Sequence, residues 1–79
     1  GIIRRAEKMA TEIELETDGN VWKLLVAEGD TVEEGQMLFI MEVMKMEVPY
    51  EAPHAGVVND LEIAEGDAVK EGDIAMVIS

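Results

Sequence analysis

Hydrophobic and polar residues alternate with a period of two along two stretches of the chain. In residues 11–16 every second position is a glutamate, and in residues 46–52 the alternate positions are Met46, Val48, Tyr50 and Ala52. Successive side chains of a β-strand point to opposite faces, so each stretch predicts a strand with one buried and one solvent-exposed face. Extended backwards, the second pattern predicts that Met46 points into the protein and that Lys45 points outward.

Further strands are expected between and after these two stretches. Residues 37–41 and 74–78 are continuous apolar runs, which predicts strands that are apolar on both faces. Two more strands are expected along Trp22, Leu24 and Val26 and along Asn59, Leu61 and Ile63. No stretch has the apolar periodicity of an amphipathic helix.

An internal repeat organises the chain. Shifting the sequence by 37 positions aligns residues 19–35 with residues 56–72, and both copies contain Ala-Glu-Gly-Asp-x-Val-x-Glu-Gly. The Glu-Gly pairs separate the strands as turns, where glycine adopts positive φ without steric cost. A half of this size cannot bury an adequate core alone, so the two copies are expected to interlock around a pseudo-twofold axis. Short, evenly spaced strands joined by such turns predict an all-β sandwich or flattened barrel.

The segment from Glu42 to Glu47 lies between the two copies and departs from this turn pattern. It must form a tight hairpin, yet it contains neither glycine nor the Asn-Gly pair that two-residue hairpins favour. Met44 and Met46 also occupy positions where a soluble protein normally has polar residues. Because local rules fail most often at functional sites, Lys45 and its apolar neighbours form the candidate site.

Length and composition exclude several classes of function. A chain of 79 residues is expected to form one domain, and its formal net charge of −12 disfavours nucleic acid and anionic membrane surfaces as partners. The apolar content of 48% indicates a folded, soluble protein, which we expect to be monomeric. The absence of cysteine excludes disulfides, thiolate catalysis and cysteine-based zinc sites, and it fits a reducing, cytoplasmic compartment.

Charge is unevenly distributed along the chain. Half of the six cations lie within the first eight residues, whereas from Met9 onward 17 acidic residues accompany only three cations. Residues 1–8 also lack strand alternation. They are therefore expected to be an N-terminal tail or linker, with the domain spanning residues 9–79.

The hairpin sequence resembles that of the biotinyl domains of biotin-dependent carboxylases, also called biotin carboxyl carrier proteins. Their signature is Glu-(Ala/Ser/Val)-Met-Lys-Met, and the corresponding residues here are Glu42, Val43, Met44, Lys45 and Met46. The resemblance runs from about Met9 to Ser79 and includes a Gly-Asp-x-Val-x-x-Gly turn in each half. The Ala-Pro-Met-Pro-Gly that often opens the first half of such domains is replaced by Glu-Thr-Asp-Gly-Asn at positions 16–20, which keeps only the glycine.

This resemblance implies a fold and a role. The fold is a barrel-sandwich hybrid, a flattened β-barrel of two four-stranded antiparallel sheets, of the compact type without the protruding loop of some bacterial carriers. The implied cofactor is biotin, which a biotin protein ligase attaches through biotinyl-adenylate to the ε-amine of Lys45. The domain then carries a carboxyl group from a biotin carboxylase to a carboxyltransferase, as a carrier and not an enzyme. Met44 and Met46 are expected to be recognised by the ligase, while Glu42 and Val43 complete the motif.

The acidic residues leave two interpretations open. Carboxylates such as Glu42 and Glu47 could dock on basic rims of the ligase or the carboxylase, or they could simply keep a small domain soluble. The pairs Glu33/Glu34 and Asp67/Glu71 lack the spacing of a calcium loop, so no metal site is expected.

His54 is the single histidine of the chain, and it follows Pro53 in an apparent loop. No partner for its ring is evident from the sequence, which favours a surface or turn position over a ligand or a general base. No combination of nucleophile, base and oxyanion donors is recognisable, so catalysis by this chain alone is not expected.

Two alternative functions remain. A lipoyl domain has the same duplicated sandwich but usually presents Asp-Lys-Ala at the hairpin, and Met44 and Met46 argue against it. A structural adaptor in a larger assembly would have the same fold without a modified lysine. The acceptor of the carboxyl group stays open among acetyl-CoA, propionyl-CoA, pyruvate, urea and others, because its specificity resides in the carboxyltransferase.

Overall fold

The computed structural model describes residues 10–79, which form strands and turns without a helix. The strands are β1 (Thr11–Glu14), β2 (Gly19–Leu24), β3 (Thr31–Val32), β4 (Met37–Val43), β5 (Met46–Glu51), β6 (Gly56–Asn59), β7 (Ala68–Val69) and β8 (Ile74–Ile78). The predicted tail at residues 1–8, and the predicted start of the domain at Met9, lie outside the described residues. Within residues 10–79 there is no helix long and apolar enough to cross a membrane.

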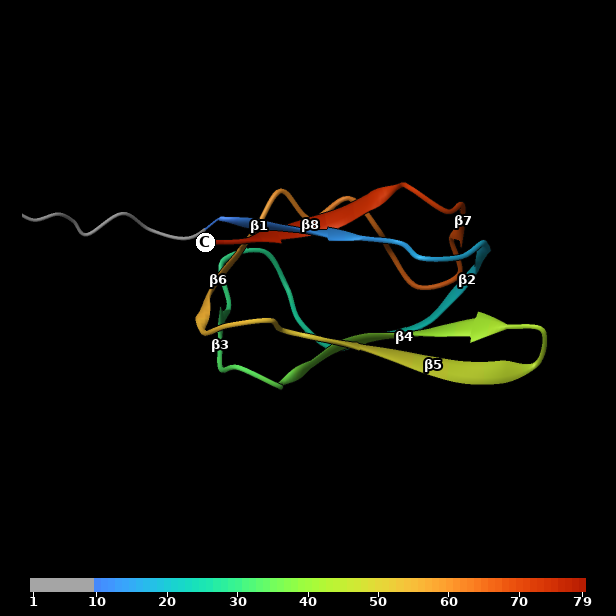
Figure 1. Ribbon diagram of the computed structural model, residues 1–79, viewed down its shortest axis with the longest axis horizontal. Helices are drawn as coiled ribbons and strands as arrows, with labels where there is room; N and C mark the ends of the chain where they lie inside the picture. The colour runs from blue at the N-terminus through green and yellow to red at the C-terminus, as the bar shows by residue number, and fades with distance from the viewer. Residues whose placement is uncertain (1–9) are drawn as a thin grey trace, which may run out of the picture.

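Two four-stranded sheets, with strand orders β1-β8-β6-β3 and β5-β4-β2-β7, pack against each other (Figure 1). All strand pairs are antiparallel. A shift of 37 residues converts the first strand order into the second, since it places β1 on β5, β8 on β4, β6 on β2 and β3 on β7. Each sheet therefore contains strands of both halves, and the predicted interlocked sandwich with internal twofold repetition is confirmed. Neither half could form its sheet without the other.

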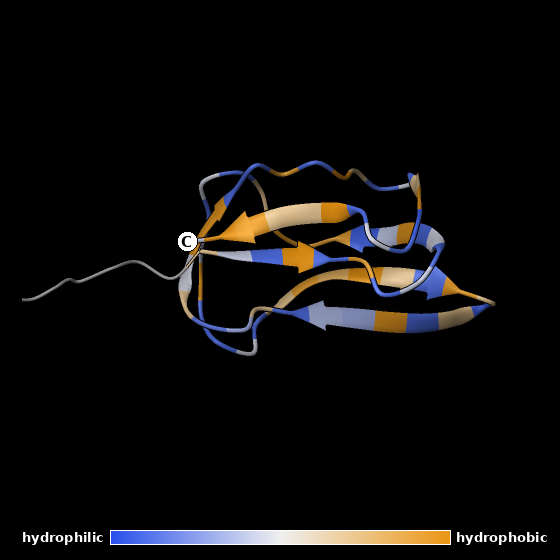
Figure 2. Cartoon of the chain, turned by 45° about the horizontal axis from the view of Figure 1, so that its top comes forward, coloured by the Kyte–Doolittle hydropathy of each residue, from blue (hydrophilic) through white to orange (hydrophobic). Residues whose placement is uncertain are grey.

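The core lies between the sheets and is built mainly on the two central apolar strands, β4 and β8. Leu38, Phe39 and Met41 of β4 are fully buried, as are Met76 and Ile78 of β8. These are the two strands predicted to be apolar on both faces, and Figure 2 shows hydrophobic residues along both. Burying each such side chain stabilises the fold by about 1.5–3 kcal/mol relative to its exposure, which makes β4 a firm base for the segment that follows it.

The glycine turns repeat the same geometry in both halves. Gly35 and Gly72 have φ of +83° and +90°, and their N–H groups donate to the carbonyls of Ala52 and Leu15, both at 2.8 Å. Position 52 is position 15 shifted by 37, so each turn ties one half to the first strand region of the other. The expectation that these glycines adopt positive φ is confirmed.

Two predicted strands are shorter than the alternation suggested. The strand expected along Trp22, Leu24 and Val26 ends at Leu24, and a register shift after Val21 leaves Val21 buried and Trp22 43% exposed. In the second half β6 ends at Asn59, because Asp60 adopts a φ of +52° and turns the chain. The two-residue strands β3 and β7 lie between turns and are too short to show a period.

Carboxylates replace the missing strand partners just beyond β6. Glu28 accepts the N–H groups of Asp60 and Leu61 at 3.1 and 2.9 Å. In the equivalent place of the other half, Glu65 accepts the N–H of Leu24 at 3.1 Å. The N–H of Leu61 is therefore satisfied without a strand partner, which allows the chain to leave the sheet after Asn59 although the alternation continues.

Candidate functional site

A two-residue hairpin between β4 and β5 carries the candidate site and projects from one end of the sandwich (Figure 1). Val43 and Met46 form the last strand pair, and Met44 and Lys45 make the turn. Both turn residues have positive φ, 52° for Met44 and 67° for Lys45, as in a type I′ turn. The predicted tight hairpin is thus confirmed, with two non-glycine residues in the left-handed region.

This turn conformation carries strain that the rest of the hairpin must hold. A non-glycine residue in the left-handed region costs about 1–2 kcal/mol, and neither methionine nor lysine has the short polar side chain that relieves it. The six register pairs between β4 and β5, from Met37↔Glu51 to Val43↔Met46, supply the ladder that fixes the turn. Backbone strain at an exposed turn is a feature that clusters at functional sites.

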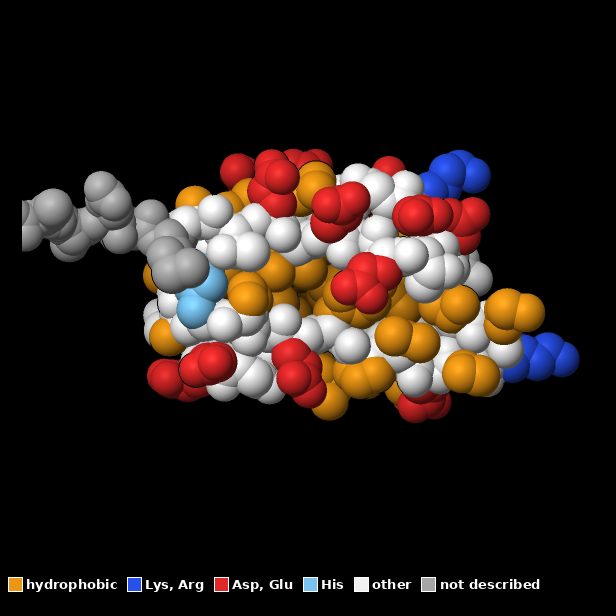
Figure 3. Space-filling model, viewed as in Figure 1, with side chains coloured by type: hydrophobic (Ala, Val, Ile, Leu, Met, Phe, Trp, Pro, Cys, Tyr) orange, Lys and Arg blue, Asp and Glu red, His pale blue; other side chains and the backbone are white. Residues whose placement is uncertain are grey.

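The side chains at the tip are apolar and accessible. Met44 is 90% exposed and Met46 65% exposed, and Lys45 between them is exposed as well. Figure 3 shows hydrophobic side chains beside a cationic one at the end of the molecule where the hairpin projects. Removing these methionines from water in a complex would be favourable, and their flexible thioethers adapt to a partner surface.

The expectation that Met46 points into the protein is wrong. Met46 lies on the same face of β5 as the half-buried Val48 and Tyr50, as the two-residue period requires. The hairpin, however, extends past the body of the sandwich, so this end of the face has nothing to pack against (Figure 1). The alternation identified the face correctly, but it carries no information on how far the opposite sheet reaches.

Two carboxylates lie at the base of the turn. Glu42 and Glu47 are directly opposite each other in the ladder, and both are exposed. Like charges directly opposed across two strands are destabilising, so this pair is a local conflict that the fold tolerates. The cation at the tip, Lys45, therefore lies close to the two negative charges of Glu42 and Glu47.

Lys45 is the one side chain of the hairpin tip that can act as a nucleophile. Its side chain is exposed, so it can be approached from the solvent side. The five residues of the motif, Glu42 to Met46, are contiguous, so the structure adds no remote residue to the site. Within the described residues 10–79, no group of three or more potential metal ligands is present.

His54 has partners that the sequence did not reveal. Its Nε2 lies 2.9 Å from Oγ1 of Thr11, and its Nδ1 lies 2.9 Å from the carbonyl oxygen of Ala55. Because that carbonyl only accepts, Nδ1 is the donor of this hydrogen bond, and Nε2 pairs with the threonine hydroxyl. His54 thereby ties the loop before β6 to the first strand, which is a structural role.

Several acidic residues of the turns accept hydrogen bonds from backbone N–H groups. Asp30 and Asp67 accept the N–H groups of Ala27 and Ala64, at 2.9 and 3.0 Å. Asp18 accepts the N–H of Glu71 at 2.8 Å. The repeated Glu-Gly-Asp sequence of the turns signals this use, since an Asp side chain bonds a backbone N–H a few residues away in such turns.

The sequence matches the family model of biotin-requiring enzymes, the biotin/lipoyl attachment family, over residues 6–78. The chain belongs to this family. The match to biotin-requiring enzymes implies biotin bound covalently to a lysine, and a lysine held out on a strained hairpin, away from the side chains of the body, fits such an attachment. The fold, the hairpin and the family together define a biotinyl carrier domain.

Two curated relatives extend this assignment. A biotinylated protein TB7.3 homolog from Mycobacterium leprae is 38% identical over 71 residues, which is 90% of this chain and 100% of that protein. A biotin/lipoyl attachment protein from Bacillus subtilis is 42% identical over 45 residues, or 57% of this chain, and the match spans 62% of that relative.

Solved structures share the fold. The urea carboxylase of Kluyveromyces lactis contains a region that superposes on 100% of this chain with a TM-score of 0.80 and 33% identity, and that region is 7% of the much longer enzyme. A lipoyl domain of the 2-oxoglutarate dehydrogenase complex from Azotobacter vinelandii superposes on 80% of the chain with a TM-score of 0.72 at 24% identity. The second likeness concerns the fold alone, so the residues of the hairpin must distinguish biotin from lipoate.

Proposed function

We propose that Lys45 is the residue to which biotin is attached, and that the domain moves a carboxyl group between two active sites. The observation that carries the proposal is the hairpin itself: a lysine in a strained two-residue turn, flanked by Met44 and Met46 that are 90% and 65% exposed. A soluble domain gains nothing in its own stability from this arrangement. A partner that must recognise one lysine gains both an apolar surface and a fixed backbone.

In the attachment step Lys45 acts as the nucleophile toward biotinyl-adenylate in a biotin protein ligase. Its ε-amine must be deprotonated to have a lone pair, which attacks the acyl carbon. The new bond is the amide C–N bond, the bond that breaks is the acyl C–O bond to AMP, and the proton passes to a base of the ligase or to water. The left-handed conformation of Met44 and Lys45 presents the amine beyond the apolar side chains.

As a carrier the domain contributes position and not chemistry. When bound, biotin supplies a ureido nitrogen that accepts and releases a carboxyl group. The β4–β5 ladder holds the attachment point rigidly, and the long lysine side chain supplies the reach, so the cofactor is kept at high effective concentration near both active sites. We propose a biotin carboxylase and a carboxyltransferase as the two partners, in the cytoplasm, with the acceptor set by the transferase.

The direct test is the intact mass of the chain after incubation with a biotin protein ligase, biotin and ATP. One added biotinyl group is expected, and none for Lys45→Arg. Lys70→Arg is the matched control, because Lys70 is an exposed lysine beside a glycine turn, and it should be modified like the parent chain. Addition to Lys45→Arg would contradict the site, and modification by a lipoate ligase but not by the biotin ligase would favour the lipoyl alternative.

We further propose that Glu42 and Glu47 contact basic residues of the ligase. The two carboxylates flank the turn and are the charges nearest to Lys45 in the ladder. The double variant Glu42→Gln/Glu47→Gln should slow biotinylation and weaken its dependence on salt. The matched pair Glu33→Gln/Glu34→Gln removes the same charge elsewhere and should leave the rate near that of the parent chain. A parent rate that is independent of salt would contradict this electrostatic contact.

A further inference from the structure

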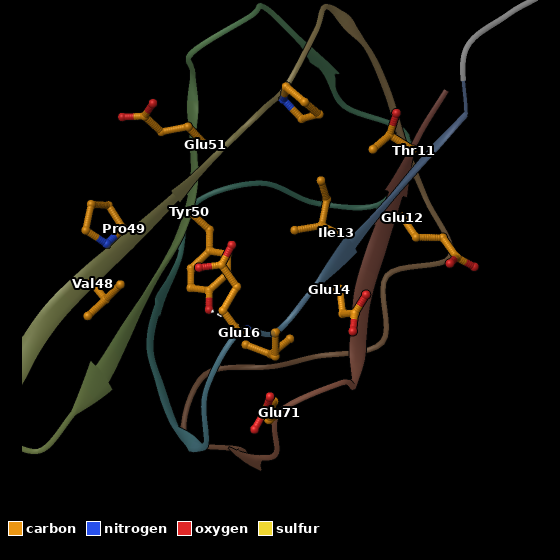
Figure 4. Close-up of a pocket in the computed structure, with 12 residues that line it drawn as sticks. Thr11, Glu12, Ile13, Glu14, Glu16, Val48, Pro49, Tyr50, Glu51 and Glu71 are labelled. Carbon is orange, nitrogen blue, oxygen red and sulfur yellow. Dashed lines mark hydrogen bonds between the residues drawn. The ribbon is translucent and has the colours of Figure 1, made fainter.

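A groove separates the two edge strands β1 and β5 on one side of the sandwich (Figure 4). Its volume is about 660 Å³, and the apolar residues that line it are Ile13, Leu15, Val48, Pro49, Tyr50 and Pro53. Figure 3 shows hydrophobic side chains visible in the depression between the sheets. None of the motif residues from Glu42 to Met46 lines it, so the groove is distinct from the lysine hairpin.

Fixed side chains shape this groove. The hydroxyl of Tyr50 accepts the N–H of Glu16 across it at 3.0 Å, drawn as the dashed line in Figure 4. The Tyr50 ring is stacked on buried Phe39 with the ring centroids 4.7 Å apart. His54 and Thr11 join the two edges at another point, at 2.9 Å. The groove is therefore preformed, which lowers the entropic cost of filling it.

Within the part of the chain that the structure describes, no strand pairs with β1 on the side of the groove. Leu15, just after β1, exchanges backbone hydrogen bonds with Asp73 and Gly72, so its polar groups face β8. These directions alternate along β1. The register shift between Ile13 and Glu14 skips Ala75 of β8 and no residue of β1, so the N–H and C=O groups of Glu12 and Glu14 point the other way. The N–H of Glu16 points that way too, and it meets Tyr50 across the groove.

The opposite edge, β5, is closed to strand addition by a proline. Pro49 pairs with Ile40 between the pairs Met41↔Val48 and Phe39↔Tyr50, at a position whose N–H would point away from β4. Proline has no N–H, and it is one of the residues by which sheet edges are protected. Pro49 is the 37-residue equivalent of Glu12, so the protein blocks one of two equivalent edges and leaves the other available.

The rims of the groove are uniformly acidic. Among the described residues 10–79, its lining includes the exposed residues Glu12, Glu14, Glu16, Glu51 and Glu71, and no lysine, arginine or histidine. Figure 4 shows Glu16 beside Tyr50, whereas Glu12 and Glu51 point away toward the two outer rims. The apolar floor and the acidic rims lie on opposite faces of the pleated strand β1.

We propose that this groove binds an extended segment of a partner protein as an added strand on β1. A strand that continues the sheet also continues its pleat, so its alternate side chains lie beside Glu12 and Glu14 on the outer face and over Ile13 and Tyr50 on the inner face. The first set must be lysine or arginine and the second set apolar. The segment is therefore basic and alternating, and it tethers the domain through a surface that leaves Lys45 accessible.

The test uses the full chain labelled with ¹⁵N and a capped synthetic peptide in which three lysines alternate with valines. Chemical shifts are expected to move at the amides of Glu12, Glu14 and Tyr50 and to stay in place at Met44 and Lys45. Binding should weaken as salt is raised, and a peptide with glutamates in place of the lysines should bind at least tenfold more weakly.

The decisive variant is Glu12→Pro, which removes the outward N–H. Pro49 at the equivalent position shows that the fold accommodates proline there, and the amide signals of β8 report that the variant is folded. Peptide affinity should fall at least tenfold in Glu12→Pro and only about twofold to threefold in Glu14→Gln, which loses a charge but keeps its N–H.

Three results would overturn the proposal. The first is unchanged affinity in folded Glu12→Pro. The second is a set of shifts centred on the hairpin instead of β1. The third, contacts between residues 2–8 of the free chain and Tyr50 in nuclear Overhauser spectra, would mean that the groove is occupied by the protein's own N-terminal residues.

Discussion

Gly19 of β2 lies against the backbone of Glu42 in β4, so closely that a Cβ atom at position 19 would be 2.7 Å from the carbonyl oxygen of Glu42. The same Cβ would also be 3.0 Å from Cγ2 of Val43. Glycine at this position therefore allows β2 to lie close to its neighbouring strand β4 at the base of the hairpin. Gly56, its equivalent in the second half, would bring a Cβ to 2.8 Å from the carbonyl oxygen of Ser79, and it lies in the sheet that does not carry the hairpin.

Gly19→Ala is expected to destabilise the domain and to disturb the hairpin. The closest atom is the backbone carbonyl oxygen of Glu42, which cannot rotate away, so the strands must separate at a cost of about 1–3 kcal/mol. Urea unfolding measures the stability, and the rate of biotinylation by the ligase measures the hairpin. Gly56→Ala is the control: it should lose similar stability while its folded fraction is biotinylated at the parent rate. Equal slowing in both variants would show that the effect is global.

Met44→Asn should raise stability and lower recognition at once. Asparagine is a favoured first residue of a type I′ turn, because its short polar side chain tolerates the left-handed conformation, and it should add about 0.5–1 kcal/mol. The same change removes an exposed apolar side chain that we propose as a ligase contact. Thermal unfolding should therefore shift upward while the biotinylation rate falls several-fold. A rate that rises with stability would contradict the recognition role of Met44.

The sequence predicted the fold well because the fold is duplicated. One 37-residue shift relates every strand and the Glu-Gly-Asp and Glu-Gly turns of the first half to the second, so weak local signals were present twice. The ends of β2 and β6 were not predicted, since they depend on a register shift at Trp22 and on the positive φ of Asp60. Neither feature has a sequence signal as strong as glycine.

The candidate site was predictable in its residues but not in its geometry. The motif from Glu42 to Met46 is contiguous, and the absence of glycine in a necessary turn was visible in the chain. The exposure of Met46 was not predictable, because it depends on how far the hairpin projects past the opposite sheet. The groove between β1 and β5 was not predictable either, since it requires knowledge of which strands become sheet edges.

Tyr50→Phe should be mildly destabilising, and Tyr50→Ala severely so. The phenylalanine variant loses only the hydroxyl that accepts the N–H of Glu16, at a cost of about 0.5–1.5 kcal/mol, and it keeps the ring on Phe39. The alanine variant also loses the ring stack and leaves a cavity against Phe39, at a cost of about 3–5 kcal/mol. Urea unfolding of both variants measures the difference. Equal losses would mean that the hydrogen bond, and not the stacked ring, holds the two edges in place.

The pseudo-symmetry offers a matched comparison for the carboxylates that bind backbone N–H groups. Glu28 accepts two such groups, from Asp60 and Leu61, whereas its equivalent Glu65 accepts one, from Leu24. Each charge-assisted hydrogen bond of this kind is worth about 1 kcal/mol at an exposed position. Glu28→Ala should therefore cost about twice as much stability as Glu65→Ala in urea unfolding, although both remove one negative charge from a chain of net charge −12. If relief of charge repulsion dominated instead, both variants would be stabilised to a similar extent, and raising the salt concentration would abolish the gain.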